Sequence, residues 1–423
     1  MNHQTGLSIE VLRSGAVLVP IVVTGGLWLT ATPRVKGAAF LALLWNFLTL
    51  LLVNALAVQQ HWWSFGTDGL MWAAVPVDVI LGWAALWGAV PILLMQWIRP
   101  PLTVGVLVAA DVVAMGSLQP LVELTSTWWW GELSAVVCAL IPGVVLGVST
   151  AAERALRVRA SMQVVLFGAV LGFGIPTVAF EVDGLGWFDR IRDVGGVLDS
   201  VMIQIGVVIA IVALRAVADF AAVGGGTPYP WDPPKKLVTT GPYAYVANPM
   251  QISAVALLLI AAVVFREPVI AAAAVVGAAF SAGLAAWHEH EQLSERFGSA
   301  WIDYRASVRD WIPRWSPTAE ASGTLYASVT CDPCSTVGPW FERTEPVGLV
   351  VRPAEDHPDE LRRIQYEGAV TLTGTRAIGG ALEHVSLGWA LLGWIMRAPI
   401  LGWFLQLLVD ASGGGPRRLA APD

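Results

Sequence analysis

The chain has 423 residues, of which 56% are hydrophobic and 13% are charged, and its mean hydropathy is +0.63. Soluble globular domains carry about 25% charged residues, so this composition excludes an ordinary soluble protein. The sequence has no basic patch interleaved with aromatic residues, which disfavours nucleic-acid binding. Three cysteines are too few for a disulfide framework. The net charge of −7 is less informative than the way charges are distributed among the connections between apolar segments.

Nine apolar segments predict the architecture. Most are close to the length of about 20 residues that spans a bilayer as a helix. They cover residues 15–31, 38–58, 70–97, 102–121, 133–148, 162–180, 201–223, 250–265 and 269–287. The last two are short enough to form a tight hairpin. We therefore expect an all-α polytopic membrane protein with about nine transmembrane helices, followed by a C-terminal α/β domain.

Lysine and arginine are concentrated in alternate connections between these segments. They lie in the first, third, fifth and seventh connections and after the ninth segment. These residues are Arg34, Lys36, Arg99, Arg154, Arg157, Arg159, Lys235, Lys236, Arg296, Arg305, Arg309 and Arg314. The second and fourth connections have neither residue and carry tryptophans typical of a membrane interface. Because cytoplasmic loops are enriched in cations, we expect a multi-pass protein of the plasma (inner) membrane. Its N-terminus would lie outside, and its C-terminal domain would be cytoplasmic.

Four ionisable residues lie inside apolar segments, where charge is costly and a functional role is the default hypothesis. Arg215 and Asp219 are four residues apart on one helix face, which favours a structural ion pair. Asp78 and Asp111 have no evident partner in the sequence. Binding of a cationic headgroup, pairing with Arg215 and exposure to a wet cleft remain open for these two aspartates.

Residues 224–249 form a polar loop between two strongly apolar segments. Six prolines restrict its backbone, and it contains Tyr229, Trp231, Tyr243 and Tyr245, which are too many aromatic residues for a solvated linker. Loops of this length are usually functional or disordered. The composition therefore predicts a stiff loop that frames a functional site at the membrane face.

The end of this loop and a later helix carry a two-part motif. The first part is GPYAYVANPM at residues 241–250, followed by an apolar helix. The second part consists of Glu289, His290, Glu291, Leu293, Phe297, Gly298, Trp301, Tyr304, Ile312 and Pro313. Over about residues 227–313, both parts resemble in order and spacing the membrane methyltransferases related to isoprenylcysteine carboxyl methyltransferase and the phospholipid methyltransferases. Ala247, Gln251 and His290 depart from the family's usual Arg, Tyr and Glu.

The resemblance implies an S-adenosylmethionine-dependent methyltransferase that acts on a lipid or another amphiphilic acceptor. The residues implied to frame the cofactor on the cytoplasmic side are Gly241, Pro242, Tyr243, Tyr245, Asn248 and Pro249, with Glu289 as the acidic group. Glu289 would face Tyr243 or the ribose. His290 or Glu291, on other helix faces, would be the general base for an amine or thiol acceptor, whereas a carboxylate acceptor needs none. A solvated helix start at the membrane surface is the alternative interpretation of this acidic run.

The composition changes after Pro313. We expect strands at residues 324–329, 347–351 and 370–372, and helices at 336–342 and 359–365. Cys331 and Cys334 form a CxxC motif between the first strand and the first helix, which is the context of thioredoxin-like redox proteins. A helix start lowers the pKa of a thiol, so Cys331 would be the attacking thiolate.

The last hundred residues, 323–423, resemble the DCC-type thiol-disulfide oxidoreductases. The resemblance is carried by Cys331, Cys334, Ser335 and residues 374–377 and 389–399. The aspartate that this family has shortly before the first cysteine is missing, and Ser328 and Thr330 occupy that neighbourhood. The resemblance implies a thioredoxin-like domain with a thiol or disulfide partner, and an inactive docking module is the alternative. A metal site is not expected, because only one CxxC pair is present.

These expectations divide the chain into five parts. They are N-terminal transmembrane helices without an assigned role (1–200), a methyltransferase-like membrane core (201–315), a linker (316–322), a thioredoxin-like CxxC domain (323–411) and a disordered tail (412–423). Residues 387–409 are interrupted by Arg397 and Pro399, so we expect two short amphipathic helices there. A second interpretation remains open, namely a membrane redox carrier or transporter that uses the cysteines and the intramembrane acids.

Overall fold

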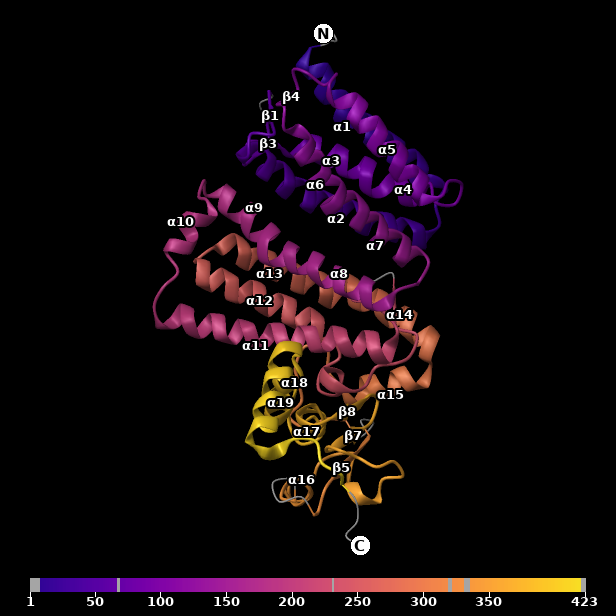
Figure 1. Ribbon diagram of the computed structural model, residues 1–423, viewed down its shortest axis with the longest axis vertical. Coiled ribbons are helices and arrows are strands. Elements are labelled where there is room, and N and C mark those ends of the chain that lie inside the picture. The colour runs from indigo at the N-terminus through magenta and orange to yellow at the C-terminus, as the bar shows by residue number, and fades with distance from the viewer. Residues whose placement is uncertain (1–7, 67–68, 230–231, 319–321, 331–334, 420–423) are drawn as a thin grey trace. The chain divides into compact units, whose positions relative to one another are not determined.

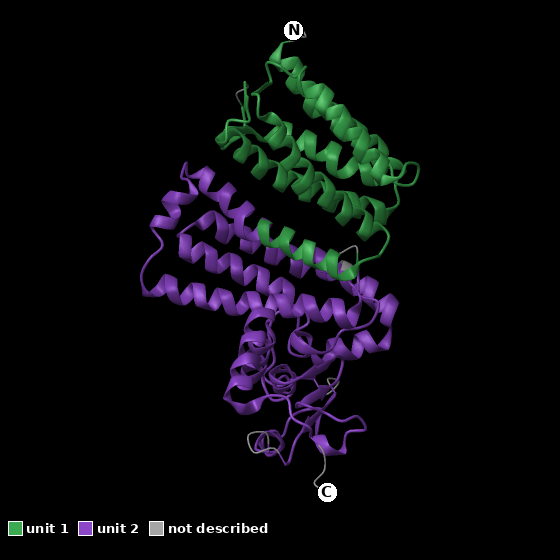
Figure 2. Ribbon diagram, in the orientation of Figure 1, with its two compact units in different colours: residues 1–169, 229–232 green, residues 170–228, 233–423 purple. Residues whose placement is uncertain are grey.

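The computed structural model describes residues 8–66, 69–229, 232–318, 322–330 and 335–419. The chain divides into two compact units, shown in Figure 2. The first contains residues 1–169 and 229–232, and the second contains residues 170–228 and 233–423. The five-part division expected from the sequence is finer than this and stays a prediction.

The first unit is mainly helical, with two short antiparallel strand pairs (Figure 1). Its helices are α1 (Ile9–Thr30), α2 (Pro33–Gln59), α3 (Val77–Ala84), α4 (Val90–Leu93), α5 (Pro100–Met115), α6 (Trp128–Ala135), α7 (Ile141–Ala151) and α8 (Leu156–Ala169). The strands β1 (Trp63–Phe65) and β4 (Val122–Leu124) pair with each other, as do β2 (Met71–Trp72) and β3 (Val75–Pro76). Single π-helical turns join α3 to α4 and α6 to α7.

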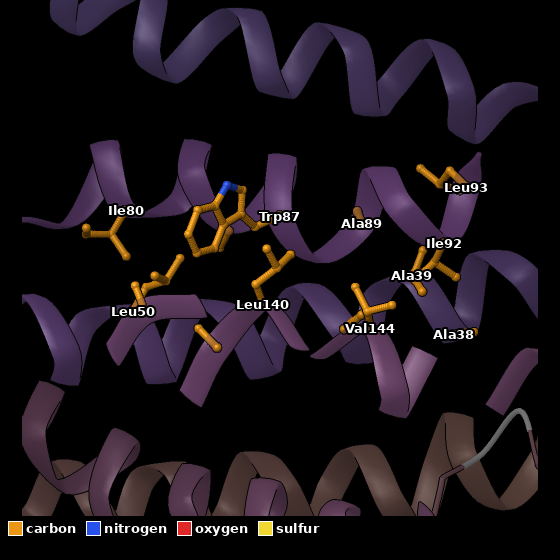
Figure 3. Close-up of a cluster of buried hydrophobic side chains, with 14 of the residues drawn as sticks. Ala38, Ala39, Leu50, Ile80, Trp87, Ala89, Ile92, Leu93, Leu140 and Val144 are labelled. Atoms are coloured by element: carbon orange, nitrogen blue, oxygen red, sulfur yellow. The ribbon is translucent and has the colours of Figure 1, made fainter. Parts of the chain in front are cut away.

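The core of the first unit lies between α2, the α3–α4 helix and the α6–α7 helix. Trp87, Leu140 and Leu50 are fully buried there (Figure 3). Gly88 allows the close approach of the backbones, because a Cβ atom at this position would overlap the carbonyl of Ala42. Small residues of this kind permit tight helix packing inside a membrane, where burial away from water does not drive association.

The second unit begins with a helical membrane core. Its helices are α9 (Ile175–Val182), α10 (Trp187–Arg192), α11 (Val197–Asp219), α12 (Pro249–Phe265), α13 (Pro268–Phe280), α14 (Ala286–Phe297) and α15 (Ser299–Ser307). Helix α12 packs against both α11 and α13. The predicted hairpin is confirmed: Arg266 ends α12 in a left-handed conformation, and the Glu267 carboxylate accepts from the Val269 amide at 3.1 Å to begin α13.

Six described helices are long and apolar enough to cross a membrane, if helices joined by π-helical turns are counted as one. They are Ile9–Thr30, Pro33–Gln59, Trp128–Ala151, Leu156–Val182, Val197–Gly224 and Pro268–Phe297. The other three predicted segments coincide with the shorter apolar helices Val77–Leu93, Pro100–Met115 and Pro249–Phe265. A polytopic helical membrane protein is therefore confirmed, and the number of nine spans stays a prediction.

The C-terminal region contains a four-stranded mixed sheet with the order β6–β5–β7–β8. Its elements are β5 (Gly323–Ala327), α16 (Val337–Arg343), β6 (Leu349–Pro353), β7 (Gln365–Glu367), β8 (Thr371–Thr373), α17 (Thr375–Leu382), α18 (Leu387–Arg397) and α19 (Pro399–Val409). β5 and β6 are parallel, whereas β7 is antiparallel to both β5 and β8. Phe341 and Leu325 are buried in a core between the sheet and its helices. The three predicted strands and the two short helices after residue 386 are present.

Two expectations for this region are wrong. The helix expected at residues 359–365 is irregular chain that leads into β7, because Leu361 and Arg362 accept backbone hydrogen bonds from Leu419 and Arg417, both at 3.0 Å. This tertiary pairing outweighs local helix propensity. The same pairing gives order to part of the tail expected to be disordered, since Leu419 is buried against Leu361.

Candidate functional site

The candidate site is built on a tight turn, which we define as residues 241–247. It begins with the 3₁₀ helix Gly241–Ala244, and the amides of Tyr245 and Val246 both donate to the Pro242 carbonyl at 3.1 Å. Gly241 has a φ of 62°, and a Cβ atom there would overlap the Asp219 carboxylate at the end of α11. Only glycine meets both conditions without strain.

Asp219 is held in place by Arg215, one helical turn earlier. The Arg215 Nε donates to Asp219 Oδ2 at 2.8 Å, and a second bond joins the same two side chains. The ion pair predicted from their spacing is confirmed. It fixes the carboxylate on which the 241–247 turn rests.

A second chain segment runs beside this turn. Ala247 donates to the Arg309 carbonyl at 2.9 Å, and the amides of Arg314 and Thr318 donate to the carbonyls of Tyr245 and Ala244 at 3.0 and 3.1 Å. This segment contains the closing Ile-Pro pair of the motif. The two halves of the sequence motif therefore meet through backbone hydrogen bonds.

Tyr243 lies at the centre of the turn. The residue is 5% exposed, and its hydroxyl makes no hydrogen bond to any residue that the structure describes. Its carbonyl accepts from the Tyr304 hydroxyl at 2.9 Å. Burial raises the pKa of the Tyr243 phenol well above its usual value, and Tyr304 and the acids Glu289 and Asp219 raise it further. A buried hydroxyl without a partner is unfavourable, so this group is a candidate for contact with a ligand.

Helix α14 places its three predicted site residues differently. Glu289 is partly buried and lies near Tyr243. His290 is exposed, and its Nδ1 lies 3.2 Å from the indole Nε1 of Trp301, which donates to it. Glu291 is exposed. Consecutive residues on a helix point to different faces. Of these three residues, Glu289 is the one whose charge raises the pKa of Tyr243.

The remaining predicted cofactor residues separate into two groups. Asn248 donates to Asp310 Oδ1 at 3.2 Å, and Pro249 begins α12 directly after the turn. Tyr245 points the other way, because its hydroxyl donates to the Glu383 carbonyl at 2.8 Å and its ring meets Trp394 edge to face. The structure thus brings Gly241, Pro242, Tyr243 and Glu289 together, while the Tyr245 side chain is used in a contact with the C-terminal region.

Sequence reasoning missed two charged residues beside the site. Arg305 forms an ion pair with Asp310 at 2.6 Å, and its guanidinium lies 5.5 Å from the centre of the Trp301 ring. The sequence alone identifies Arg305 only as a cytoplasmic cation. The signal that could have identified it is its position four residues after Trp301, on the same helix face.

The predicted redox residues Cys331 and Cys334 lie outside the described residues. Before them, the Glu355 carboxylate accepts from Ser328 Oγ at 2.7 Å and from Thr330 Oγ1 at 2.8 Å. Burial opposes ionisation of Glu355, but these hydrogen bonds outweigh it and lower its pKa to about 2. After them, Ser335, Thr336, Pro339, Glu342 and Arg343 line an open cavity of about 550 Å³ at the start of α16.

The intramembrane aspartates have partners that the sequence did not reveal. Asp78 pairs with Arg13 of α1 at 2.8 Å, and Asp111 lies beside Glu132 of α6. Both contacts lie within the first unit, and Arg215 pairs with Asp219 in the second. Among the described residues, no group of three or more His, Cys, Asp or Glu side chains is arranged to hold a metal ion.

The fold and this turn define a multi-pass membrane protein with an acidic, aromatic site at the start of α12. Residues 195–300 match the sequence model of the phospholipid methyltransferase family, a range that contains both the 241–247 turn and α14. The resemblance to membrane methyltransferases is confirmed for this part of the chain, and no match supports the resemblance to DCC-type oxidoreductases. No curated protein and no solved structure matches the chain significantly. The match and the apolar helices together indicate a membrane methyltransferase.

Proposed function

We propose that the protein is an integral membrane methyltransferase that uses S-adenosylmethionine and methylates a lipid or another amphiphile. One observation carries this proposal. The family match covers the turn in which the buried Tyr243 hydroxyl has no described partner and lies near two carboxylates. The residues that match the family therefore include a buried hydroxyl that can contact a ligand.

The residues present fit the chemistry of this cofactor. Its sulfonium and ammonium groups are cations, and an aromatic face together with acidic side chains attracts cations. Tyr243 and Glu289 supply these groups, whereas Asp219 is already paired with Arg215. Arg305, next to Asp310, is the nearby donor for a carboxylate. Gly241, Pro242, Asn248 and Pro249 would shape the backbone around the cofactor, and we assign Tyr245 a supporting role.

When bound, S-adenosylmethionine supplies an activated methyl group, and the protein's main task is to align the acceptor with it. An amine or thiol acceptor must also lose a proton. His290 and Glu291 are both exposed on α14 and remain the candidate bases for that step. A carboxylate acceptor would require neither.

The experiment for the cofactor site compares two glutamates on one helix. Glu289→Ala and Tyr243→Ala should each weaken S-adenosylmethionine binding about tenfold or more, because a hydrogen bond to a charged group contributes about 1.5–3 kcal/mol. Glu295→Ala is the matched control, since Glu295 is exposed on the same helix and has no proposed role. Calorimetric titration of detergent-solubilised protein measures this. If both site variants bind as the wild type does, the pocket lies elsewhere.

We also propose that the N-terminus lies outside and that the site faces the cytoplasm of a plasma (inner) membrane. The alternation of cations among the connections supports this orientation. Cysteines introduced at residues 128–130 should react with an impermeant maleimide in intact cells, and one at Thr239 should not. The reverse pattern would place the site on the other side of the membrane.

For the C-terminal region we propose a thioredoxin-like domain in which Cys331 exchanges disulfides with a partner. The parallel β5–α16–β6 unit supports it, because the CxxC motif lies between β5 and α16 in the sequence. Cys331 should then alkylate faster than Cys334 near neutral pH, with a thiolate pKa below about 8.5. Equal, slow alkylation of both cysteines would count against disulfide exchange and favour an inactive docking module. The competing role as a redox carrier or transporter predicts a cysteine pair inside the membrane, where the sequence has only Cys138.

A further inference from the structure

The C-terminal region reaches the candidate site through one tyrosine of the turn. Tyr245 is 0% exposed, and its hydroxyl donates to the carbonyl of Glu383 at the end of α17. Burial raises the pKa of this phenol, so it stays protonated and remains a donor. Tyr243, two residues earlier, belongs to the candidate site. The same short turn therefore carries a site residue and a residue anchored in the C-terminal region.

A tryptophan of α18 covers Tyr245. Trp394 is 2% exposed, and its ring centre lies 5.8 Å from that of Tyr245 at an interplanar angle of 86°. The two rings form a small core with Ala244, Ala390, Ile211, Val212, Leu387 and Leu391. Ile211 and Val212 belong to α11, so this core joins the membrane helix, the turn and α18. The Trp394 ring packs edge to face on Tyr245, and its Nε1 donates to no described residue.

Backbone hydrogen bonds and an ion pair also hold the surroundings of Tyr245 in place. Leu387 at the start of α18 donates to the Trp315 carbonyl at 2.7 Å, and Thr318 donates to Ala244 of the turn. The buried ion pair between Arg397 and Glu383 fixes the end of α18 to the end of α17. The carbonyl that Tyr245 uses therefore belongs to a residue that is itself held in place.

We propose that Tyr245 and Trp394 are positioning residues, through which the C-terminal region holds the 241–247 turn in the geometry that the methyltransferase site requires. This inference rests on the proposed function. If the turn samples other conformations, a smaller fraction of the molecules has a site that can bind the cofactor, and the apparent affinity falls in the same proportion. Methyl transfer also depends steeply on the placement of the reacting groups. The C-terminal region is then a structural part of the methyltransferase site, in addition to any redox role.

The test uses two tryptophans of the same region. Trp394→Ala removes the ring over Tyr245, and Trp403→Ala is the control, because Trp403 on α19 is 61% exposed. Hydrogen exchange at the Tyr245, Val246 and Ala247 amides reports the turn without any ligand. We expect Trp394→Ala to speed this exchange and to weaken S-adenosylmethionine binding several-fold. Trp394→Phe should restore both, and Trp403→Ala should change neither.

Two outcomes would overturn the inference. One is unchanged exchange at these amides in a folded Trp394→Ala variant, and the other is an equal effect of Trp403→Ala. If Trp394→Ala does not fold, Tyr245→Phe, which removes only the hydroxyl, replaces it with the same expected result. If wild-type protein binds no S-adenosylmethionine, the proposed function fails, while the exchange measurement still decides whether the C-terminal region holds the turn.

Discussion

The two ends of the polar loop use buried tyrosines in opposite ways. At its beginning, the Tyr229 hydroxyl donates to the Gly37 carbonyl at 2.7 Å, and Asp232 forms a buried ion pair with Arg159. At its end, the Tyr243 hydroxyl is equally buried but has no described partner. Within the loop, residues 229–232 belong to the first unit, whereas residues 224–228 and 233–249 belong to the second.

This difference separates anchoring from binding. A buried polar group that is fully paired stabilises the structure, whereas one left unpaired costs about 1–3 kcal/mol and needs a reason to persist. The beginning of the loop is therefore an anchor. At its end, the Tyr243 hydroxyl remains available to a ligand, and the nearby acids favour a cationic one.

The largest expected effect is on the anchor. Asp232→Ala leaves the Arg159 guanidinium buried without its carboxylate, which should lower the free energy of unfolding by about 3–5 kcal/mol. Both side chains are nearly inaccessible. The control is Glu153→Ala, which breaks the more exposed ion pair with Arg34 and should cost about 0–1 kcal/mol. Thermal unfolding in detergent measures both variants, and equal losses would refute the anchoring role.

The next effect sharpens the description of the turn. Gly241→Ala should cost more than the roughly 1–2 kcal/mol of left-handed strain, because its Cβ also displaces the Asp219 carboxylate. Gly184→Ala is the matched control, with a similar φ of 68° and open space around the added atom. S-adenosylmethionine binding should fall for Gly241→Ala and stay unchanged for Gly184→Ala. Equal stability losses for both would show that Asp219 does not support the turn.

A smaller effect compares the two tyrosines directly. Tyr229→Phe removes a hydrogen bond and should destabilise the protein by about 1 kcal/mol without affecting S-adenosylmethionine binding. Tyr243→Phe removes an unpaired hydroxyl, so its stability should be unchanged or slightly higher, while binding weakens. Unfolding curves and calorimetry on the same samples distinguish the two. A destabilised Tyr243→Phe that binds normally would place Tyr243 with the anchors.

The smallest expected effect concerns another anchored loop, residues 328–330, which hydrogen-bonds to the Glu355 carboxylate. The lowered pKa of Glu355 means that its stabilising hydrogen bonds are fully present above pH 4.5 and are lost as the pH falls toward 2. Glu355→Gln should flatten this part of the stability–pH profile slightly, because the carboxylate is partly exposed. Acid titration followed by fluorescence is the measurement, and an unchanged profile would show that Glu355 does not hold the loop.

Much of the fold could be predicted from local pattern. Each of the nine apolar segments contains a helix, although residues 71–76 form the β2–β3 pair instead and α5 ends at Met115. Runs of Leu, Val and Ala specify a membrane helix through composition alone. The Arg215–Asp219 pair was predictable from its spacing. The partners of Asp78 and Asp111 were not, since they come from Arg13 and Glu132 on other helices and depend on tertiary packing.

The candidate site was predictable in part for the same reason. The motif identified Tyr243 and Glu289, and the helix period separated Glu289 from His290. It gave no indication that Tyr245 turns away, because the carbonyl that it meets belongs to Glu383, 138 residues later. Long-range contacts of this kind leave no local sequence pattern.

Locating the cofactor tests the central claim most directly. Purified wild-type protein would be irradiated with isotope-labelled S-adenosylmethionine, and the labelled peptide identified by mass spectrometry. We expect saturable labelling within residues 241–250 or 286–305 that excess unlabelled cofactor abolishes. Labelling confined to the first unit or to the cavity at α16, or no saturable labelling at all, would contradict the proposed methyltransferase site.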